Sequence, residues 1–114
     1  MSELIVSVSG IRGVVGKNLT SETVERFTLA VSAVLEAGPL IVTRDGRANG
    51  VELAEDVCRT LSSSGRNVIN GGVAATPTTG VLIREVQAAG GIQISASHNP
   101  IQYNGLKLFD QTGR

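Results

Sequence analysis

One segment near the end of the 114-residue chain carries most of its reactive side chains. It holds five groups that can move protons, donate hydrogen bonds or carry charge: Ser97, His98, Asn99, Asn104 and Lys107. The turn residues around them disfavour both helix and strand. A hydroxyl can carry a phosphoryl group, and nearby cations and amide donors stabilise the charge that moves during transfer. The segment therefore has the composition of a phosphate-handling site.

Two other charged segments are candidates for the same site. Arg12 lies between Gly10 and Gly13, and a cation flanked by small residues can approach an anion closely. Asp45 and Arg47 occupy a second Gly-containing turn, where the plainer interpretation is that they pair with each other. Both segments follow short apolar runs, as loops after strands do.

The reactive segment also has simpler interpretations. Ser97 can be a loop serine that caps a helix, and Lys107 can be a solvated strand lysine. Two other enzyme classes fit less well. A nucleotide-binding enzyme is disfavoured because the glycines of residues 10–13 do not have the spacing of a dinucleotide-binding motif, and the chain has no Gly-Lys-Ser/Thr P-loop. A serine hydrolase would need Ser97 and His98 to meet, but adjacent side chains in an extended loop point apart and no Gly-x-Ser-x-Gly elbow is present.

Composition limits the class of protein. Hydrophobic residues make up 41% and aromatic residues 3%, with 14 glycines, which favours an aliphatic α/β core with many tight turns. Zero net charge without a Lys/Arg cluster predicts a small-molecule ligand and no nucleic-acid or membrane partner. The longest uncharged run, 67–83, is broken by glycines and a proline, so we expect no membrane span. A single cysteine and no signal peptide predict a cytoplasmic protein.

A repeated strand, loop and helix pattern must position these residues. The predicted strands cover residues 4–6, 40–43, 67–70, 92–94 and 105–109. We expect residues 7–13 to be a long loop, too polar to be buried. In open α/β sheets ligands collect beyond the carboxyl ends of strands, so the loops after the first four strands should line one rim.

Three helices are predicted between the strands. Thr20 or Ser21 can cap the first, and Gly38–Pro39 ends it. Its apolar face repeats every 3.6 residues and comprises Val24, Phe27, Val31, Val34 and Leu35. The second helix has an apolar face of Val51, Ala54, Cys58 and Leu61, which makes Cys58 a small core residue. The third is short and covers residues 80–87.

Taken together, four motifs resemble the first domain of the α-D-phosphohexomutases, a family that includes phosphoglucomutase, phosphomannomutase and phosphoglucosamine mutase. They are Gly10–Gly16, Arg44–Arg47, Ser95–Pro100 and Tyr103–Lys107, in the family's order and spacing. The resemblance implies an α/β fold, a three-layer α/β/α sandwich with a mixed, mostly parallel sheet. It further implies that residues 1–114 are one N-terminal domain of a longer mutase whose later domains are absent from this chain.

The resemblance also implies roles for the candidate residues. Ser97 corresponds to the serine that carries phosphate, and Mg²⁺ would bind that phosphate, with its remaining ligands in a second domain. Arg12 and Lys107 would bind phosphate and stabilise the transferred group, and Lys107 would assist proton transfer. His98 would orient the loop or move a proton.

Asn99 and Asn104 would bind phosphate or brace the loop. The implied reaction interconverts hexose or hexosamine 1-phosphate and 6-phosphate through a 1,6-bisphosphate, which also acts as activator. The family's metal loop, sugar-recognition loop and phosphate clamp have no counterpart here, so we expect this chain alone to fold without turning over. Residues 7–9 depart from the Gly-Thr-Asp common in bacterial phosphoglucosamine mutases, which leaves the sugar open. The alternatives are a non-catalytic phosphosugar-binding module and a structural domain whose loops merely cap the sheet.

Overall fold

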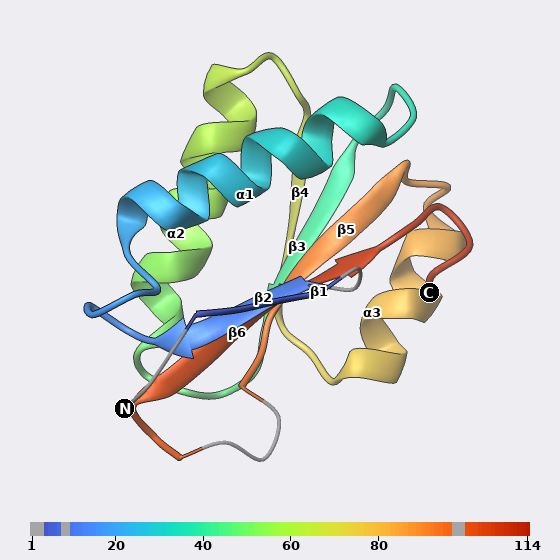
Figure 1. The fold of residues 1–114 in the computed structure, drawn as a ribbon. Coiled ribbons are helices and arrows are strands. Elements are labelled where there is room, and N and C mark those ends of the chain that lie inside the picture. The colour runs from blue at the N-terminus through green and yellow to red at the C-terminus, as the bar shows by residue number, and fades with distance from the viewer. Residues whose placement is uncertain (1–3, 8–9, 97–99) are drawn as a thin grey trace.

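A computed structural model describes residues 4–7, 10–96 and 100–114 of the chain. Its sheet has the strand order β1-β2-β6-β5-β3-β4 over these residues. The strands are β1 (Ile5–Ser7), β2 (Gly10–Val14), β3 (Leu40–Arg44), β4 (Val68–Val73), β5 (Gly90–Ile94) and β6 (Tyr103–Phe109). Helices α1 (Ser21–Val34) and α2 (Gly50–Ser63) lie on one side of the sheet, and α3 (Thr76–Glu85) lies on the other (Figure 1).

The sheet is mixed, as predicted. Strand β3 pairs in parallel with β4 and β5, whereas β6 pairs antiparallel with β5 and β2, and β1 pairs antiparallel with β2. It follows that β2, β3, β4 and β5 run in one direction and β1 and β6 in the other. Most of the described strands are therefore parallel in direction, although the three pairings along the β1-β2-β6-β5 half are antiparallel.

Apolar cores lie on both faces of the sheet. Leu40 and Val42 of β3 face α1 and α2, together with Ile92 of β5. Ile41, which lies between the two β3 residues, faces the opposite way and packs with Ile83 of α3. This alternation follows from the two-residue period of a strand, which sends successive side chains to opposite faces. The three layers of the fold are thus fixed by buried aliphatic side chains on both sides of β3 and β5.

The largest difference from the sequence-based expectation is β2. Residues 10–14 form a strand between β1 and β6, so the prediction that residues 7–13 form a polar loop is wrong for the described part of that range. Ile11 is only 6% exposed and lies in the core under α1 and α2, while the next side chain, Arg12, is exposed. Gly10, one of the glycines that indicated a loop, instead allows β2 and β6 to pack closely. A Cβ atom on Gly10 would overlap the Leu106 carbonyl oxygen.

Helix α1 begins as predicted. The Thr20 side chain accepts a hydrogen bond from the Thr23 backbone N–H at 3.3 Å, the expected N-cap contact. Val24 and Val31 are buried, but Val34 is 78% exposed, so its assignment to the apolar face is wrong. The helix ends at Val34, and the extended backbone of Leu35 turns the chain toward the sheet.

The apolar face of α2 is rotated from the predicted one. Leu53 and Val57 are buried beside Leu61, whereas Val51 is 39% exposed and was wrongly predicted as a face residue. Cys58 is partly buried and packs against the core, and burial raises the pKa of its thiol. A protonated, packed thiol agrees with the predicted core role.

Helix α3 begins four residues earlier than predicted, at Thr76. Pro77 stands in its first turn, where the missing N–H of proline costs no hydrogen bond. The hydroxyls of Thr43 and Thr79 lie 2.8 Å apart and join β3 to α3 through a buried hydrogen bond. The Thr76 hydroxyl donates to Gln93 Oε1 on β5, so the start of α3 is attached to two strands by polar side chains.

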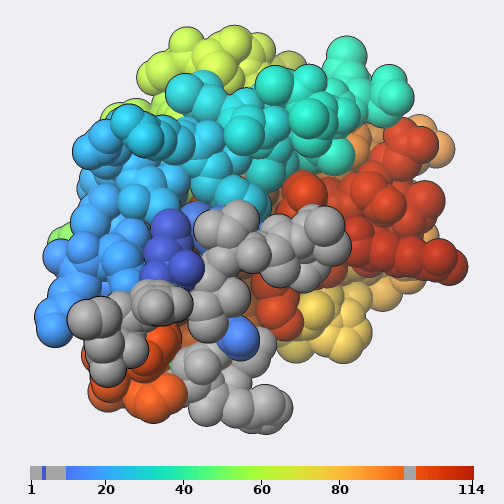
Figure 2. Space-filling model, in the orientation of Figure 1, coloured from blue at the N-terminus to red at the C-terminus, as the bar shows by residue number. Residues whose placement is uncertain are grey.

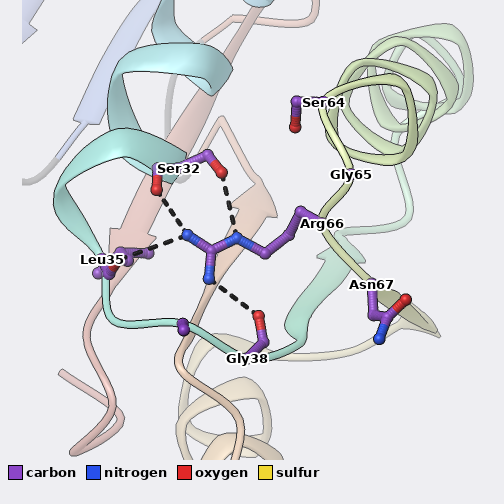
Figure 3. A pocket seen from close by; sticks show the side chains of 8 residues that line it. Ser32, Leu35, Gly38, Ser64, Gly65, Arg66 and Asn67 are labelled. Carbon is purple, nitrogen blue, oxygen red and sulfur yellow. Dashed lines mark hydrogen bonds between the residues drawn. The ribbon is translucent and has the colours of Figure 1, made fainter.

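Arg66 ties α1 to the segment between α2 and β4, on the rim opposite the predicted site. Its guanidinium donates to the carbonyl oxygens of Ser32, Leu35, Glu36 and Gly38 and to the Ser32 hydroxyl. Figure 3 shows this side chain reaching from the α2–β4 connection into a pocket at the end of α1. The last carbonyls of a helix have no partner within the helix, so Arg66 supplies the donors that α1 lacks.

We expect Arg66→Ala to lower the free energy of unfolding by about 2 kcal/mol, because several carbonyl oxygens lose a charged donor and gain only water. Urea denaturation of the chain measures this difference. Arg26→Ala is the matched control, since Arg26 makes an exposed pair with Glu22 at 3.0 Å on α1. Such exposed pairs contribute less than about 0.5 kcal/mol. Equal effects of the two substitutions would contradict the capping role.

Candidate active site

The predicted phosphoacceptor segment follows directly from the buried strand β5. The described chain runs from β5 through Ser95 and Ala96, and resumes at Pro100 ahead of β6. Ser97, His98 and Asn99 lie outside the described residues, so the roles given to them stay predictions. Their neighbours on both sides are described and show what surrounds the segment.

Arg12 and Lys107 lie on the same face of the sheet. Ile11 of β2 pairs with Leu106 of β6, and both face the core beneath α1 and α2. Arg12 and Lys107 each follow one of these residues, so they face the opposite side, the side of α3. The pairing of Lys107 with Gln93 of β5 agrees, because Gln93 is bonded to the start of α3.

The register makes the two cations diagonal neighbours with a glycine opposite each. Arg12 pairs with Gly105, and Lys107 pairs with Gly10. Diagonal neighbours on an antiparallel pair have Cβ atoms roughly 7 Å apart, so an anion can contact both side chains. The two glycines place no side chain between the cations and leave the strand backbone as a flat floor. Figure 2 shows the red end of the chain on the right of the molecule, between the surfaces of α1 (light blue) and α3 (yellow).

The cations also lie close to the predicted phosphoacceptor segment. The Ser95 backbone N–H donates to the Gly105 carbonyl oxygen at 2.9 Å, which places Ser95 beside the residue opposite Arg12. Arg12 is exposed and Lys107 is partly buried. Two positive side chains on a glycine floor beside a serine-containing loop form a site that suits a phosphate group.

The Asp45–Asn49 turn lies against the same segment and is bonded to it at several points. Asp45 accepts a hydrogen bond from the Ala96 N–H, and Arg47 donates to the carbonyl oxygen of Pro100. The loops after β3 and β5 therefore share one rim, as predicted. The prediction is wrong for the first strand, because β1 runs opposite to β3 and β5 and its carboxyl end lies at the other rim. Asp45 and Arg47 do pair within the turn, because the Asp45 carboxylate accepts the Arg47 backbone N–H. The Arg47 guanidinium instead binds the carbonyl oxygens of Pro100 and Tyr103.

Asn104 is fully buried, with 0% of its surface exposed. Its amide nitrogen donates to Asn49 Oδ1 at 2.8 Å, and its own Oδ1 accepts the Gly105 N–H at 2.9 Å. Sequence reasoning did not identify Asn49 as a contact of this segment. The spacing between residues 49 and 104 gives no local signal, because only the folded sheet brings them together. Phosphate binding by Asn104 stays a prediction.

A metal site was expected only in part within this chain. Among the residues that the structure describes, no three side chains of His, Cys, Asp or Glu lie together as a metal ion requires. Mg²⁺ prefers about six oxygen ligands in octahedral geometry. The described residues alone do not assemble such a set.

None of the described helices is long and apolar enough to cross a membrane.

The structure is an α/β/α domain with two cations on one face of its sheet. Comparison with known proteins agrees on this fold. The family described as "Phosphoglucomutase/phosphomannomutase, alpha/beta/alpha domain I" matches residues 3–114. The chain belongs to this family.

Individual relatives support the same assignment. A protein of Pyrococcus horikoshii described as a probable phosphoglucosamine mutase is 43% identical over 105 residues, which cover 92% of this chain and 23% of that protein. A phosphoglucosamine mutase of Prochlorococcus marinus (strain MIT 9215) is 38% identical over 96% of this chain and 25% of its own length.

Solved structures show the same fold. A Thermus thermophilus protein described as a phosphomannomutase matches 99% of this chain with a TM-score of 0.89 and 33% identity, over 27% of its own length. A Burkholderia thailandensis protein of the phosphoglucomutase/phosphomannomutase family matches 91% of this chain with a TM-score of 0.77 and 30% identity, over 25% of its own length. The chain thus spans about a quarter of the length of these relatives.

Proposed function

We propose that this chain is the phosphoserine-bearing first domain of a longer phosphohexomutase. In this proposal Ser97 carries the phosphoryl group that converts a hexose or hexosamine 1-phosphate into the 6-phosphate through a 1,6-bisphosphate. The observation that carries the proposal is the diagonal pair of Arg12 and Lys107 on a glycine floor beside Ser95. Family membership supports the general reaction.

The proposed transfer uses the residues of this chain as follows. A sugar hydroxyl attacks the phosphorus of phosphorylated Ser97, its new P–O bond forms, and the bond from phosphorus to Ser97 Oγ breaks. The proton of the sugar hydroxyl ends on Ser97 Oγ, with Lys107 as the group that relays it. Arg12 holds the equatorial phosphate oxygens, where the charge of the transition state is spread. His98 orients the loop, and Asn99 donates a hydrogen bond to the phosphate.

Several parts of the proposal lie outside this chain. A Mg²⁺ ion on the phosphate of Ser97 needs further ligands from the rest of the protein, and so does recognition of the sugar. We therefore expect residues 1–114 alone to fold without catalysing turnover. A cytoplasmic location belongs to the proposal, since a lone Cys58 suits a reducing compartment. The sugar that the enzyme prefers is left open.

The test is mass spectrometry of the full-length protein after incubation with a hexose 1,6-bisphosphate and Mg²⁺. We expect one phosphoryl group on the peptide that contains Ser97 and none in Ser97→Ala. Ser95→Ala is the matched control, because it removes a hydroxyl two residues away and should keep the phosphoryl group. A folded full-length protein that binds phosphosugar but takes no phosphoryl group at Ser97 would instead identify a non-catalytic binding module.

A further inference from the structure

Both carboxylate oxygens of Asp45 are used to connect the β3–α2 turn to the β5–β6 loop. Oδ1 accepts the backbone N–H of Arg47 at 3.1 Å, within the turn. Oδ2 accepts the backbone N–H of Ala96 at 3.1 Å, 51 residues further along the chain. The Asp45 backbone N–H also donates to the Ile94 carbonyl oxygen at 2.9 Å. This turn therefore fixes the residue immediately before Ser97.

Two other side chains of the same turn hold the chain after Asn99. Arg47 Nη1 donates to the carbonyl oxygens of Pro100 at 2.6 Å and Tyr103 at 3.4 Å. Asn49 Nδ2 donates to the Ile101 carbonyl oxygen at 2.9 Å. One five-residue turn thus bonds to both flanks of the segment 97–99.

Besides these side-chain contacts, two backbone hydrogen bonds hold the flank after Asn99: the Val15 N–H donates to the Gln102 carbonyl oxygen at 3.0 Å, and the Tyr103 N–H donates to the Pro100 carbonyl oxygen at 2.9 Å. Pro100, Ile101 and Gln102 are all exposed, and Ile101 is 82% exposed, so these side chains contribute little core packing. Proline also offers no backbone N–H. The polar contacts from Arg47 and Asn49 are therefore a main restraint on this flank.

Asn49 shows that this restraint is made in place of a helix cap. It is the N-cap residue of α2, and asparagine at that position usually accepts a hydrogen bond from the first turn. Here its side chain makes no capping bond. It donates to Ile101 and accepts from Asn104 instead. The first two N–H groups of α2 bond to the carbonyl oxygens of Arg47 and Ala48, which leaves the Asn49 side chain available for the β5–β6 loop.

We propose that the Asp45–Asn49 turn is a positioning element that fixes both flanks of residues 97–99 and thereby sets the rate of phosphoryl transfer to Ser97. The inference rests on the proposed function. Transfer depends on placing the reacting oxygen in line with phosphorus, and a shift of about 1 Å can lower such a rate about 100-fold. Asp45, Arg47 and Asn49 act through the backbone and are not catalytic residues.

The first test compares two substitutions that keep the size of the side chain. Asp45→Asn leaves one acceptor oxygen for the N–H groups of Arg47 and Ala96. The bond to Arg47 is a local turn contact that asparagine also makes, so we expect the bond to Ala96 to be lost. Asp110→Asn is the matched control, because Oδ1 of Asp110 alone accepts the N–H groups of Thr112 and Arg114 in a similar turn. We expect Asp45→Asn to speed hydrogen exchange of the Ala96 amide at least tenfold and Asp110→Asn to leave it unchanged.

The second test separates positioning from stability. Asn49→Asp keeps the shape and suits a helix N-cap, but it cannot donate to the Ile101 carbonyl oxygen. In the full-length protein we expect an unchanged or higher melting temperature and a 10-fold to 100-fold lower maximal rate of Ser97 phosphorylation. The concentration of bisphosphate giving half the maximal rate should stay the same, because the Asn49 side chain bonds to Ile101 and Asn104 and acts on the position of the loop.

The outcomes distinguish the two proposals. If the wild-type protein is phosphorylated at Ser97 and both Asp45→Asn and Asn49→Asp are phosphorylated at the same rate, the positioning role is overturned. The proposed function is then unaffected. A wild-type protein that takes no phosphoryl group would overturn the proposed function. The restraint would then be judged by exchange of the Ala96 amide alone, and unchanged exchange in Asp45→Asn would overturn it too.

Discussion

Arg12→Ala in the full-length protein should lower the maximal rate of Ser97 phosphorylation by roughly 100-fold to 1,000-fold, the usual effect of removing one preorganised donor from a developing charge. Arg12 is exposed on the sheet face and diagonal to Lys107, so its removal leaves Lys107 without the neighbouring cation. Rapid-quench measurement of phosphoenzyme formation gives the rate. Arg12→Lys should recover part of the lost rate, because a lysine supplies the positive charge but cannot make the bidentate hydrogen bonds of an arginine.

The control for Arg12→Ala is Arg26→Ala, which removes the same side chain from the exposed face of α1. We expect this variant to phosphorylate Ser97 at the wild-type rate. If Arg12→Ala and Arg26→Ala behaved alike while the protein stayed folded, the cation pair would have no part in transfer. The proposed function would then lose the observation that carries it.

Gly10→Ala should lower the free energy of unfolding by about 3 kcal/mol or more, at the upper end of what overpacking costs. The added methyl group would overlap the Leu106 carbonyl oxygen, and backbone atoms of a central strand cannot move aside cheaply. Gly10 also has φ +151°, a conformation that L-residues rarely adopt. Urea denaturation of the chain measures the loss.

Gly16→Ala separates the effect of backbone conformation from the effect of a steric clash. Gly16 has φ +84° but no atom within 4 Å of an added Cβ, so its substitution tests backbone conformation without a clash. We expect it to cost about 1 kcal/mol. Equal losses at the two positions would show that the close approach of β2 to β6 contributes nothing to the cost at Gly10.

The elements that local chemistry determines could be predicted from the sequence. Thr20 and the 3.6-residue spacing of Val24 and Val31 indicated the start and the buried face of α1. The strand at β2 could not be predicted, because Gly10 and Gly13 are typical of a loop unless the neighbouring strand is known. Val51 was misassigned because the apolar residues of α2 fit two adjacent faces, and only packing against the sheet selects Leu53 and Val57.

The candidate site, like the fold, could be predicted only in part. Arg12 and Lys107 were predicted as candidates from their types and surroundings, yet their diagonal placement depends on pairing between strands more than 80 residues apart. The contacts of Asp45, Arg47 and Asn49 gave no signal because their partners are mostly backbone atoms, which every sequence supplies. Sequence reasoning identifies side chains that can do chemistry, whereas the fold decides which backbone atoms they meet.

The sheet order has a consequence for the way the chain folds. Strands β3, β4 and β5 are close in sequence and pair with one another. In contrast, β2 can pair with β6 only after β6, the last of the described strands, has been synthesised. Pairings this distant form late, because the entropy of closing the long loop is lost before any contact compensates for it. During synthesis the edge of β2 that pairs with β6 therefore stays without a partner until residues 103–109 have emerged. Arg12 and Lys107 come together only at that last step, so affinity for an anion on this face should appear with the completed sheet and not before it.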